Sequence, residues 1–320
     1  MSLSQMQVFN SYLMPVLAEI YPQEIQKFNA ASNGAIVLQS AGFDGDFFRE
    51  SFYNALHSAQ RRVDRYAAQA SAAATDLTQS QQSMVKVAGG FGPIRYEPSQ
   101  MSWLNKPTQE GIEVAARMFA EALLADQLNT AVAAGVAAIG NVSALVNDVS
   151  ASAKITHSAL NSTDALFGDM SQRLVARVMT GLQYHTLIGE NLANAQDLFK
   201  SDTVRIVDIL GKAIVVTDVP ALRVAGTPNK QKVLTLVAGG IMVSDSGDLI
   251  TNIETKNGQT RIETTMQSDY TFGLGIKGFT WDETNGGKSP TDAELATGTN
   301  WDKVKTSVKE CAGVLTVGQE

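Results

Sequence analysis

Two glycine-rich stretches near the C-terminus have the residue types of phosphate-binding loops. GLGIKG, at residues 273–278, matches the dinucleotide-binding pattern, whose glycines let the backbone approach a pyrophosphate at a helix N-terminus. The residues that follow, 279–281, predict a continuing strand and not a helix. GGKSP, at 286–290, has Asp282 where a phosphate loop requires its first glycine. We interpret the first stretch as part of a strand and the second as a turn.

Three histidines and one cysteine are the remaining candidates for catalysis or metal binding. They are His57, His157, His185 and Cys311. No histidine has a serine or cysteine nucleophile in a recognisable motif nearby, so we interpret all three as structural. Cys311 lies among small and apolar residues, which indicates a buried, unreactive thiol. One cysteine excludes an internal disulfide, and scattered histidines do not supply a zinc site. We expect no catalytic residues, no cofactor and no metal.

The composition narrows the class of protein. A chain of 320 residues exceeds the needs of one core, so we expect two compact lobes, or one lobe with long extensions. Charged residues make up 18%, against roughly 25% in typical soluble proteins. A soluble chain with so few charges either buries surface against partners or is covered by small polar residues. The net charge of −7 argues against a protein whose main role is to neutralise phosphates.

No targeting or membrane-spanning segment is expected. The first basic residue is Lys27, so the N-terminus lacks the basic region of a secretory signal. The longest charge-free run, residues 127–147, is long enough to span a bilayer. Its apolar content is mostly alanine and polar residues interrupt it, so we interpret it as a soluble helix followed by a loop. We expect a cytosolic protein.

Apolar spacing predicts the elements of the N-terminal half. Prolines and scattered apolar residues in the first forty residues are typical of an arm that packs against something else. From Asp46 to Val63, apolar residues recur at steps of three or four, which predicts a helix with arginines on its opposite face. Residues 84–103, which glycines and prolines interrupt, are expected to be extended and strand-like. The longest helix is predicted at about 109–139 and would measure roughly 45 Å.

The C-terminal half mixes helices and strands. A second helix is predicted at 163–191 and a short one at 300–309. Two β-runs are predicted at 203–222 and a similar pair at 232–245. The Asn-Gly pair at 257–258, which alternating polar and apolar residues flank, predicts a β-hairpin turn. This order of elements predicts an α+β protein with extensions.

The densest cluster of charge is RRVDR, which contains Arg61, Arg62 and Arg65. On the predicted helix, it is either a solvated face or a patch that faces another subunit or a nucleic acid. Arginine suits the second interpretation, because its planar guanidinium pairs with carboxylates and phosphates through two hydrogen bonds. The pattern alone leaves both interpretations open.

Four stretches together resemble the major capsid proteins of tailed bacteriophages, which share the HK97-type fold. VKVAGGFGPIRYE, at 85–97, is similar to the extended loop that precedes the spine helix of that family. DALFGDMSQRLVARVMTGLQYHTLI, at 164–188, looks like the helix before its axial strands, and LGKAIVVTDVP, at 210–220, looks like the strand and turn that follow. GFTWDETNGGKSPTDAELATGTNWDKV, at 278–304, is similar to the C-terminal signature of one branch.

The resemblance implies an α+β, HK97-like capsid fold. Residues 1–40 would form an N-terminal arm, and residues 41–105 would form an extended loop. The peripheral domain would combine a spine helix, within 106–150, with a β-rich return and C-terminal tail at 250–320. The axial domain would lie between these parts, at 151–249.

The resemblance also implies a function. Such proteins assemble as pentamers and hexamers into an icosahedral shell that encloses double-stranded DNA without reading its sequence. The expected partners are further copies of the chain, a portal protein and a decoration protein. A separate scaffolding protein is also expected, because the chain begins without a long, charged, helical pro-segment, and we expect no trimming of the subunit. The implied location is the virion capsid, assembled in the host cytoplasm.

Two alternatives stay open. An encapsulin-like cellular compartment would share the fold but hold a cargo enzyme in place of DNA. A small-molecule enzyme with a mixed α/β lobe would need a pocket with convergent polar groups, and no motif in the sequence supplies one. For the capsid function, we expect assembly contacts in the extended loop, where arginines would pair with acids of a neighbouring copy. The residues expected at these contacts are Arg61, Arg62, Arg65, Phe91, Pro93, Arg95, Tyr96 and Trp103.

Overall fold

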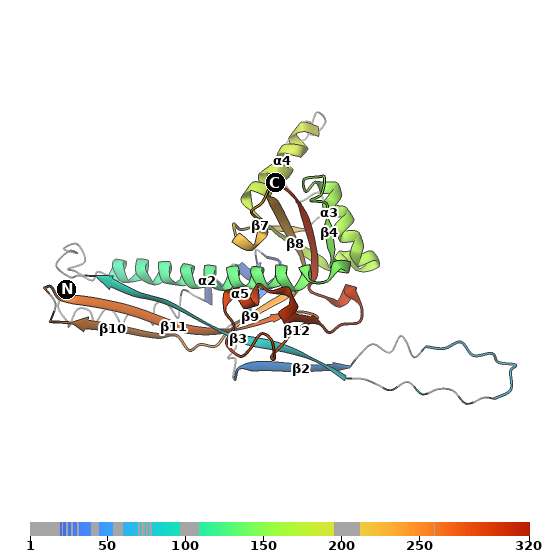
Figure 1. Cartoon of the computed structure of the whole chain (residues 1–320), viewed down its shortest axis with the longest axis horizontal. Helices are drawn as coiled ribbons and strands as arrows, with labels where there is room; N and C mark the ends of the chain where they lie inside the picture. The colour runs from blue at the N-terminus through green and yellow to red at the C-terminus, as the bar shows by residue number, and fades with distance from the viewer. Residues whose placement is uncertain are drawn as a thin grey trace.

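The helix α2, Gln109–Gly140, lies along the molecule and contacts strands of both of its large sheets (Figure 1). It confirms the long helix expected at 109–139. Alanines dominate its buried second half, and a Cβ at Gly135 would lie 2.6 Å from Cδ1 of Ile241. Small residues therefore let the helix approach the strands closely. The computed structural model describes residues 32–39, 45–53, 60–69, 79–96, 109–194, 212–258 and 260–320, with isolated residues at 20–30 and 71–76.

Part of this helix, Arg117–Gly140, is long and apolar enough to cross a membrane by length and composition. In the structure, 56% of its most apolar window is buried inside the protein. The helix packs against strands from both sheets, which is the environment of a core helix. The interpretation of the charge-free run at 127–147 as a helix followed by a loop agrees with this arrangement.

The first sheet is a long layer, mostly antiparallel, along one side of α2 (Figure 1). Its order is β1–β9–β11–β3–β2, and β10 pairs with β11 beyond the end of β9. The turn between β10 and β11 contains Gly258 at a φ of 92°, so the hairpin expected at 257–258 is confirmed. The strands are β1 (Ile36–Gln39), β2 (Phe47–Tyr53), β3 (Gln79–Tyr96), β9 (Ile241–Asp245), β10 (Ile250–Lys256) and β11 (Glu263–Ile276).

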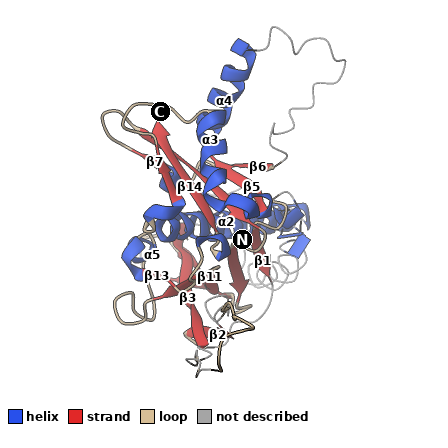
Figure 2. Cartoon of the chain, turned by 90° about the vertical axis from the view of Figure 1, so that its right-hand side faces the viewer, coloured by secondary structure: helices blue, strands red, loops and turns tan. Residues whose placement is uncertain are grey.

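The second sheet lies on the other side of α2, with the order β4–β14–β8–β5–β6, and β7 pairs with β8. The helix α3 (His157–Asp164) packs against β14, and α4 (Gly181–Asn194) extends away from the sheet (Figure 2). The strands are β4 (Val146–Asp148), β5 (Leu174–Met179), β6 (Ala213–Val216), β7 (Arg223–Val224), β8 (Lys230–Val237) and β14 (Gly313–Gln319).

A small sheet of two strands, β12 (Phe279–Trp281) and β13 (Trp301–Lys303), packs against β3 and β11. It follows the stretch GLGIKG, whose first residues end β11, so the interpretation of that stretch as a strand is confirmed. The GGKSP stretch is bent, irregular backbone with no helix or strand, which agrees with its interpretation as a turn. Short 3-10 segments connect the elements at Ser143–Leu145, Ala165–Arg173, Pro220–Leu222, Gly298–Asn300 and Val308–Glu310.

The helix predicted from Asp46 to Val63 is wrong. Residues 47–53 form β2, which pairs antiparallel with β3, and residues 60–64 have no regular structure. Aromatic residues favour strands, and here the ladder with β3 outweighs their helical spacing. The arginines of RRVDR therefore do not lie on a helix.

The helix predicted at 163–191 is also wrong. α3 ends at Asp164, a 3-10 segment with Gly168 at a φ of 54° follows, and β5 then runs between β6 and β8. A strand buried on both faces shows a continuous apolar run, and such a run cannot be distinguished from a buried helix by spacing alone. Only the last part of the predicted helix is helical, as α4.

The short helix predicted at 300–309 is wrong as well. The helix in this region is α5 (Asp292–Leu295), which begins with a capping box between Thr291 and Glu294. A threonine followed three residues later by glutamate is a sequence signal for a helix start. Trp301–Lys303 instead forms β13.

The β-runs predicted in the C-terminal half are confirmed where the structure describes them. The second run of 203–222 is β6, whereas the first run lies outside the described residues. The pair at 232–245 is β8 and β9, which belong to different sheets. The extended stretch predicted at 84–103 is β3 as far as Tyr96, and the rest of that stretch lies outside the described residues.

Candidate functional site

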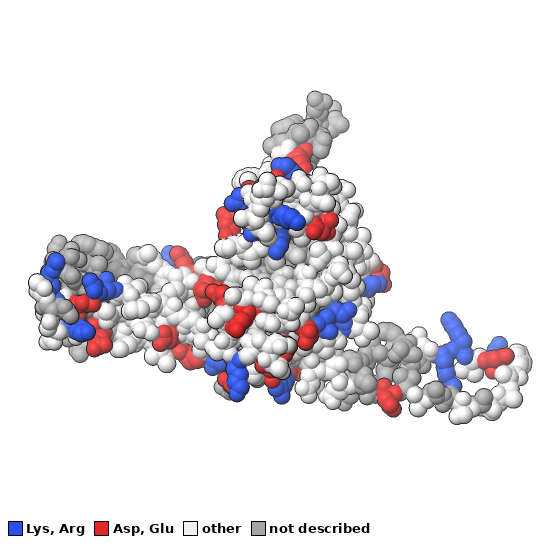
Figure 3. Space-filling model, viewed as in Figure 1, with Lys and Arg blue, Asp and Glu red and all other residues white. Residues whose placement is uncertain are grey.

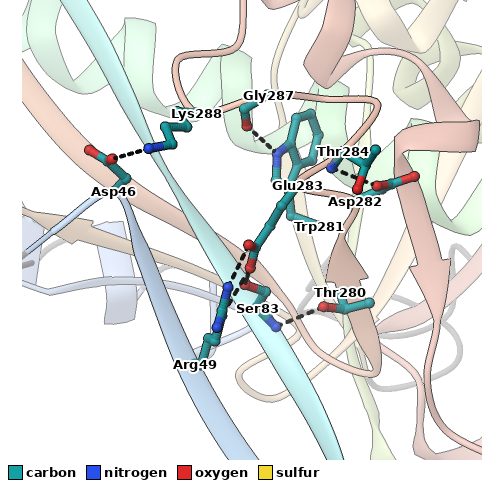
Figure 4. Close-up of polar contacts among 10 residues, drawn as sticks. All are labelled: Asp46, Arg49, Ser83, Thr280, Trp281, Asp282, Glu283, Thr284, Gly287 and Lys288. Atoms are coloured by element: carbon teal, nitrogen blue, oxygen red, sulfur yellow. Dashed lines mark hydrogen bonds and ion pairs between the residues drawn. The ribbon is translucent and has the colours of Figure 1, made fainter.

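The strands β2 and β3 leave the body as a hairpin, and the loop after β12 holds its root (Figure 4). Arg49 on β2 donates from Nε to Oε1 of Glu283 at 3.0 Å, and from Nη2 to Oε2. The hydroxyl of Ser83 on β3 donates to the same Oε1 at 2.9 Å. The backbone N–H of Ser83 donates to Oγ1 of Thr280 at 2.8 Å. One carboxylate therefore ties both strands of the hairpin to the body.

The charges at the root reinforce this attachment. The hydrogen bond from Arg49 lowers the pKa of the Glu283 carboxyl, partial burial opposes the shift, and the Ser83 hydroxyl adds to it. The same carboxylate raises the pKa of Arg49. A second ion pair, 3.8 Å between Nζ of Lys288 and Oδ2 of Asp46, lies near it (Figure 4). The root is therefore a set of charge contacts that solvent reaches.

Two tryptophans fix the loop that carries Glu283. Trp281 and Trp301 are buried, and their rings meet edge to face with centroids 4.9 Å apart. Nε1 of Trp281 donates to the carbonyl oxygen of Gly287 at 3.0 Å (Figure 4), and Nε1 of Trp301 donates to that of Leu295 at 3.0 Å. A Cβ at Gly286 would lie 2.1 Å from the Trp281 ring, so a glycine is needed where the loop passes the ring.

The side chain of Asp282 closes the turn around Glu283. Its Oδ1 accepts hydrogen bonds from the backbone N–H groups of Thr284 at 2.9 Å (Figure 4) and of Asn285 at 3.2 Å. A hydrogen bond from the Asn285 side chain, together with these two backbone bonds, lowers the pKa of the Asp282 carboxyl. These bonds lie within the turn and do not involve the hairpin. The turn therefore presents Glu283 to the hairpin in a fixed position.

The far end of the hairpin carries the predicted arginines. Arg61, Arg62 and Arg65 are exposed in a segment, 60–69, that projects beyond the body (Figures 1 and 3). Three arginines and one aspartate give this segment a charge of +2. The Tyr66 side chain beside Arg65 is 91% exposed. The structure therefore brings the three arginines together at the tip of a projecting loop.

Phe91 contacts residues of its own chain. Its ring meets Phe119 of α2 edge to face with centroids 5.0 Å apart, and Tyr270 of β11 at 5.5 Å. The side chain is half-buried by these contacts. These contacts help to pack the first sheet on α2 within one chain. Contact of the Phe91 ring with another copy stays a prediction.

The other predicted residues of the loop lie near the end of β3. Pro93 and Arg95 are exposed, and Nη1 of Arg95 lies 3.5 Å from Oε1 of Glu263 on β11. The backbone of Tyr96 ends β3, and its side chain is not described. Trp103 lies outside the described residues. Pro93 and Arg95 lie at the C-terminal end of β3, more than 25 residues along the chain from Arg65.

The described candidates for chemistry lie on or beside different elements of the chain. Cys311 is buried, as expected, and burial raises the pKa of its thiol to about 11. His157 begins α3 and His185 lies within α4, whereas His57 lies outside the described residues. Within the described ranges, no group of three His, Cys, Asp or Glu side chains is arranged to hold a metal ion.

Sequence reasoning missed the residues that anchor the hairpin. Arg49 and Glu283 are 234 positions apart, and no local pattern marks either of them. Ser83 ends a run of glutamines and serines at 79–83, and no spacing in that run marks it. Only a contact prediction or a structure could bring these three residues together.

Solved structures with a similar architecture identify the fold. A chain of the Cyanophage Pam1 capsid asymmetric unit matches with a TM-score of 0.52 and 12% identity, over 89% of this chain and 88% of that one. A chain of Microbacterium phage Oxtober96 matches with a TM-score of 0.50 and 11% identity, over 90% of each. At this identity the likeness shows the fold, which is the HK97-like α+β fold of tailed-phage capsid proteins. No curated protein sequence matches the chain.

The family follows from the sequence itself. The model of the Gp13-like family, described as "Major capsid protein 13-like", matches residues 5–315. The chain belongs to this family of major capsid proteins, which confirms the resemblance found in the sequence. The protein is therefore a component of a phage capsid.

Proposed function

We propose that the chain assembles with copies of itself, as pentamers and hexamers, into an icosahedral shell that encloses double-stranded DNA. The observation that supports this best is the projecting segment 60–69, whose exposed arginines lie beyond the body of an elongated subunit. An element that projects from one end and binds elsewhere on an identical copy makes a head-to-tail contact. Such contacts close into rings when the rotation between copies closes, and pentamers and hexamers are rings.

We further propose that the shell confines its DNA and does not read it. The net charge of −7 makes the chain a poor neutraliser of phosphates, so a motor and not the wall would drive the DNA inside. A portal protein, a separate scaffolding protein and an outer decoration protein are the further proposed partners. Assembly is proposed to take place in the host cytoplasm.

The proposed domains follow the two large sheets. The peripheral domain would contain α2, the first sheet and the pair β12–β13, and the axial domain would contain the second sheet with α3 and α4. The residue limits expected from the sequence differ from this division at four strands. β9 falls within 151–249 and β1 within the arm at 1–40, but both pair in the first sheet. β4 falls within 106–150 and β14 within 250–320, but both pair in the second sheet. The N-terminal arm at 1–40 lies largely outside the described residues.

Electron microscopy of negatively stained protein, expressed with the genes that neighbour its own, tests the proposal. We expect closed particles hundreds of ångströms across, which light scattering on the soluble fraction would also detect. Nuclease-resistant DNA inside them would support the phage function, whereas a protein cargo without DNA would favour the encapsulin-like compartment. Small monodisperse subunits in the presence of scaffolding and portal proteins would contradict shell assembly.

A further inference from the structure

A hollow on the first sheet has the chemistry to receive arginine side chains. Its volume is about 340 Å³, and residues of β3, β10, β11 and the β9–β10 connection line it. Within it, Gly90, Asp269 and Ile250 lie side by side on three neighbouring strands. Residues paired across strands point to the same face of a sheet, and neighbours along a strand point to opposite faces. Because the next residue, Tyr270, bonds to α2, Asp269 points to the face away from α2.

This face offers a carboxylate beside apolar surface. The Ile250 side chain is 68% exposed, and Asp269 is exposed beside it. A Cβ at position 90 would lie 2.9 Å from Oδ1 of Asp269, so Gly90 leaves room for the carboxylate. An exposed carboxylate next to an isoleucine suits arginine, whose guanidinium pairs with the acid while its stem covers apolar surface.

The two carboxylates of the hollow differ in their partners. Asp248 accepts hydrogen bonds from the backbone and hydroxyl of Thr271, and its Oδ2 lies 3.5 Å from Nζ of Lys86. Asp269 accepts only from the neutral side chain of Gln267, at 3.2 and 3.5 Å, among the described residues. Asp269 is therefore the carboxylate that can take a cation from outside the chain.

The occupant with matching charge is the segment 60–69 of another copy. It carries a charge of +2 and the exposed ring of Tyr66, and arginine and tyrosine are enriched in the residues that dominate interfaces. Its own hollow is out of reach, because the segment projects past one end of the molecule while β10 and β11 extend toward the other (Figure 1). The chain thus carries a basic projection and an acidic receptor at different places.

We propose that the arginine tip of one copy docks into this hollow on the next copy, with an arginine guanidinium on Asp269. The proposal rests on the proposed shell function and names the surface on which the projecting loop is received. Each copy donates one tip and accepts one, which is the head-to-tail arrangement that closes into rings.

A pair of cysteines tests the contact directly. Arg62→Cys with Asp269→Cys should form disulfides between copies under mild oxidation, and a non-reducing gel should show a ladder ending at the ring size. The native Cys311 is 1% exposed and its thiol has a raised pKa, so it should not compete. Arg62→Cys with Asp292→Cys, an exposed position on α5, is the control and should give no ladder.

Charge reversal supplies a second and independent test. Arg62→Glu and Asp269→Arg should each lower the yield of particles by about tenfold, because the contact repeats around every ring, and the double variant should recover it. Both sites are exposed, so circular dichroism should show folded subunits in all three. Particles at full yield in the single variants, with no specific ladder, would overturn the docking proposal while leaving shell assembly intact. Absence of particles in the unmodified protein would instead count against the shell function.

Discussion

The hydroxyl of Tyr270 on β11 donates a hydrogen bond to a carboxylate oxygen of Asp126 on α2. The two residues are 144 positions apart, and their bond ties the first sheet to the long helix at a point where aromatic rings also meet. A Cβ at Gly89, directly across the strand pair, would lie 2.7 Å from the Tyr270 ring. The glycine therefore gives the ring its place between β3 and the helix.

Replacing Tyr270 by phenylalanine should weaken this tie without opening a cavity. The ring contacts would stay, whereas the hydrogen bond to a carboxylate would be lost, at a cost of about 1–2 kcal/mol in the free energy of unfolding. Urea unfolding of the subunit measures the change. Tyr66→Phe is the matched control, because that side chain is 91% exposed and its hydroxyl should not matter for stability. Equal stability of the two variants would contradict the role of the bond.

Gly286→Ala should disturb the tryptophan pair. The added methyl group would overlap the ring of Trp281, which is 2% exposed and has little room to move. Overpacking of this kind costs about 1–3 kcal/mol. Thermal unfolding, monitored by tryptophan fluorescence, is the measurement. Gly189→Ala in α4 is the control, since open space surrounds that position and alanine should raise stability by about 0.5–1 kcal/mol. A stable Gly286→Ala variant would show that the loop can shift.

Asp164→Asn should destabilise the second sheet. Oδ2 of Asp164 accepts from Nη2 of Arg177 at 2.7 Å and from Nζ of Lys212, and all three side chains are at most 9% exposed. Removing one charge of a buried cluster costs about 3 kcal/mol, because the opposite charges lose their compensation. Glu320→Gln removes the ion-pair partner of Arg223, whose side chain is 54% exposed, and should cost at most about 1 kcal/mol. Chemical denaturation measures the loss of stability in both variants. Similar denaturation midpoints for Asp164→Asn and Glu320→Gln would contradict this prediction.

The attachment of the hairpin should depend on pH. The folded protein lowers the pKa of Glu283 below its ordinary 4.5, so the ionised carboxylate stabilises the root above that pH. The contribution is lost as the pH falls through the lowered pKa. Hydrogen exchange of the β2 amides should be faster in Glu283→Gln than in the unmodified protein at pH 7, and the difference should disappear as the pH falls below 4.5 through the lowered pKa of Glu283. Asp302→Asn, at another exposed acid, should match the unmodified protein throughout.

Trypsin should cut the free subunit first in the segment 60–69. Its arginines are exposed and lie in irregular backbone, whereas Arg223 lies in β7 and is paired with β8. Assembled particles should resist the same cut, because the tip would be covered by a neighbouring copy. Mass spectrometry of early digestion products identifies the sites. Equal rates of cleavage in subunits and particles would contradict docking of the tip.

The elements that sequence predicts well have signals within a few residues. The helix at 109–139 has a proline and threonine at its start and a long run of helix formers, and the structure has α2 there. The Asn-Gly pair at 257–258 predicts a turn between two strands, and β10 and β11 pair on either side of it. The resemblance to capsid proteins rested on the order of four sequence stretches along the chain. That order can be read without knowing which strands pair.

The failures occur where distant residues decide the structure. Residues 174–179 have helical spacing, but their neighbours β6 and β8 enclose them in a sheet. The aromatic residues of 47–53 likewise form a strand because this segment pairs with β3. The root of the hairpin depends on Arg49 and Glu283, and no property of either residue alone predicts their meeting. Nor does spacing show that Gly90 and Asp269 share one face of the sheet.

The division of the strands between the sheets has a mechanical consequence. β8 and β9 are joined by a short turn at 238–240 and lie in different sheets. The chain also runs from β13, in the small sheet with β12, to β14 in the second sheet. α2 is a further connection, because it follows β3 of the first sheet along the chain and precedes β4 of the second. Rotating one large sheet against the other would strain all these connections at once. We therefore expect the subunit to resist such a rotation. In the proposed shell, we therefore expect the contacts between copies to yield under internal pressure before the joints within one copy do.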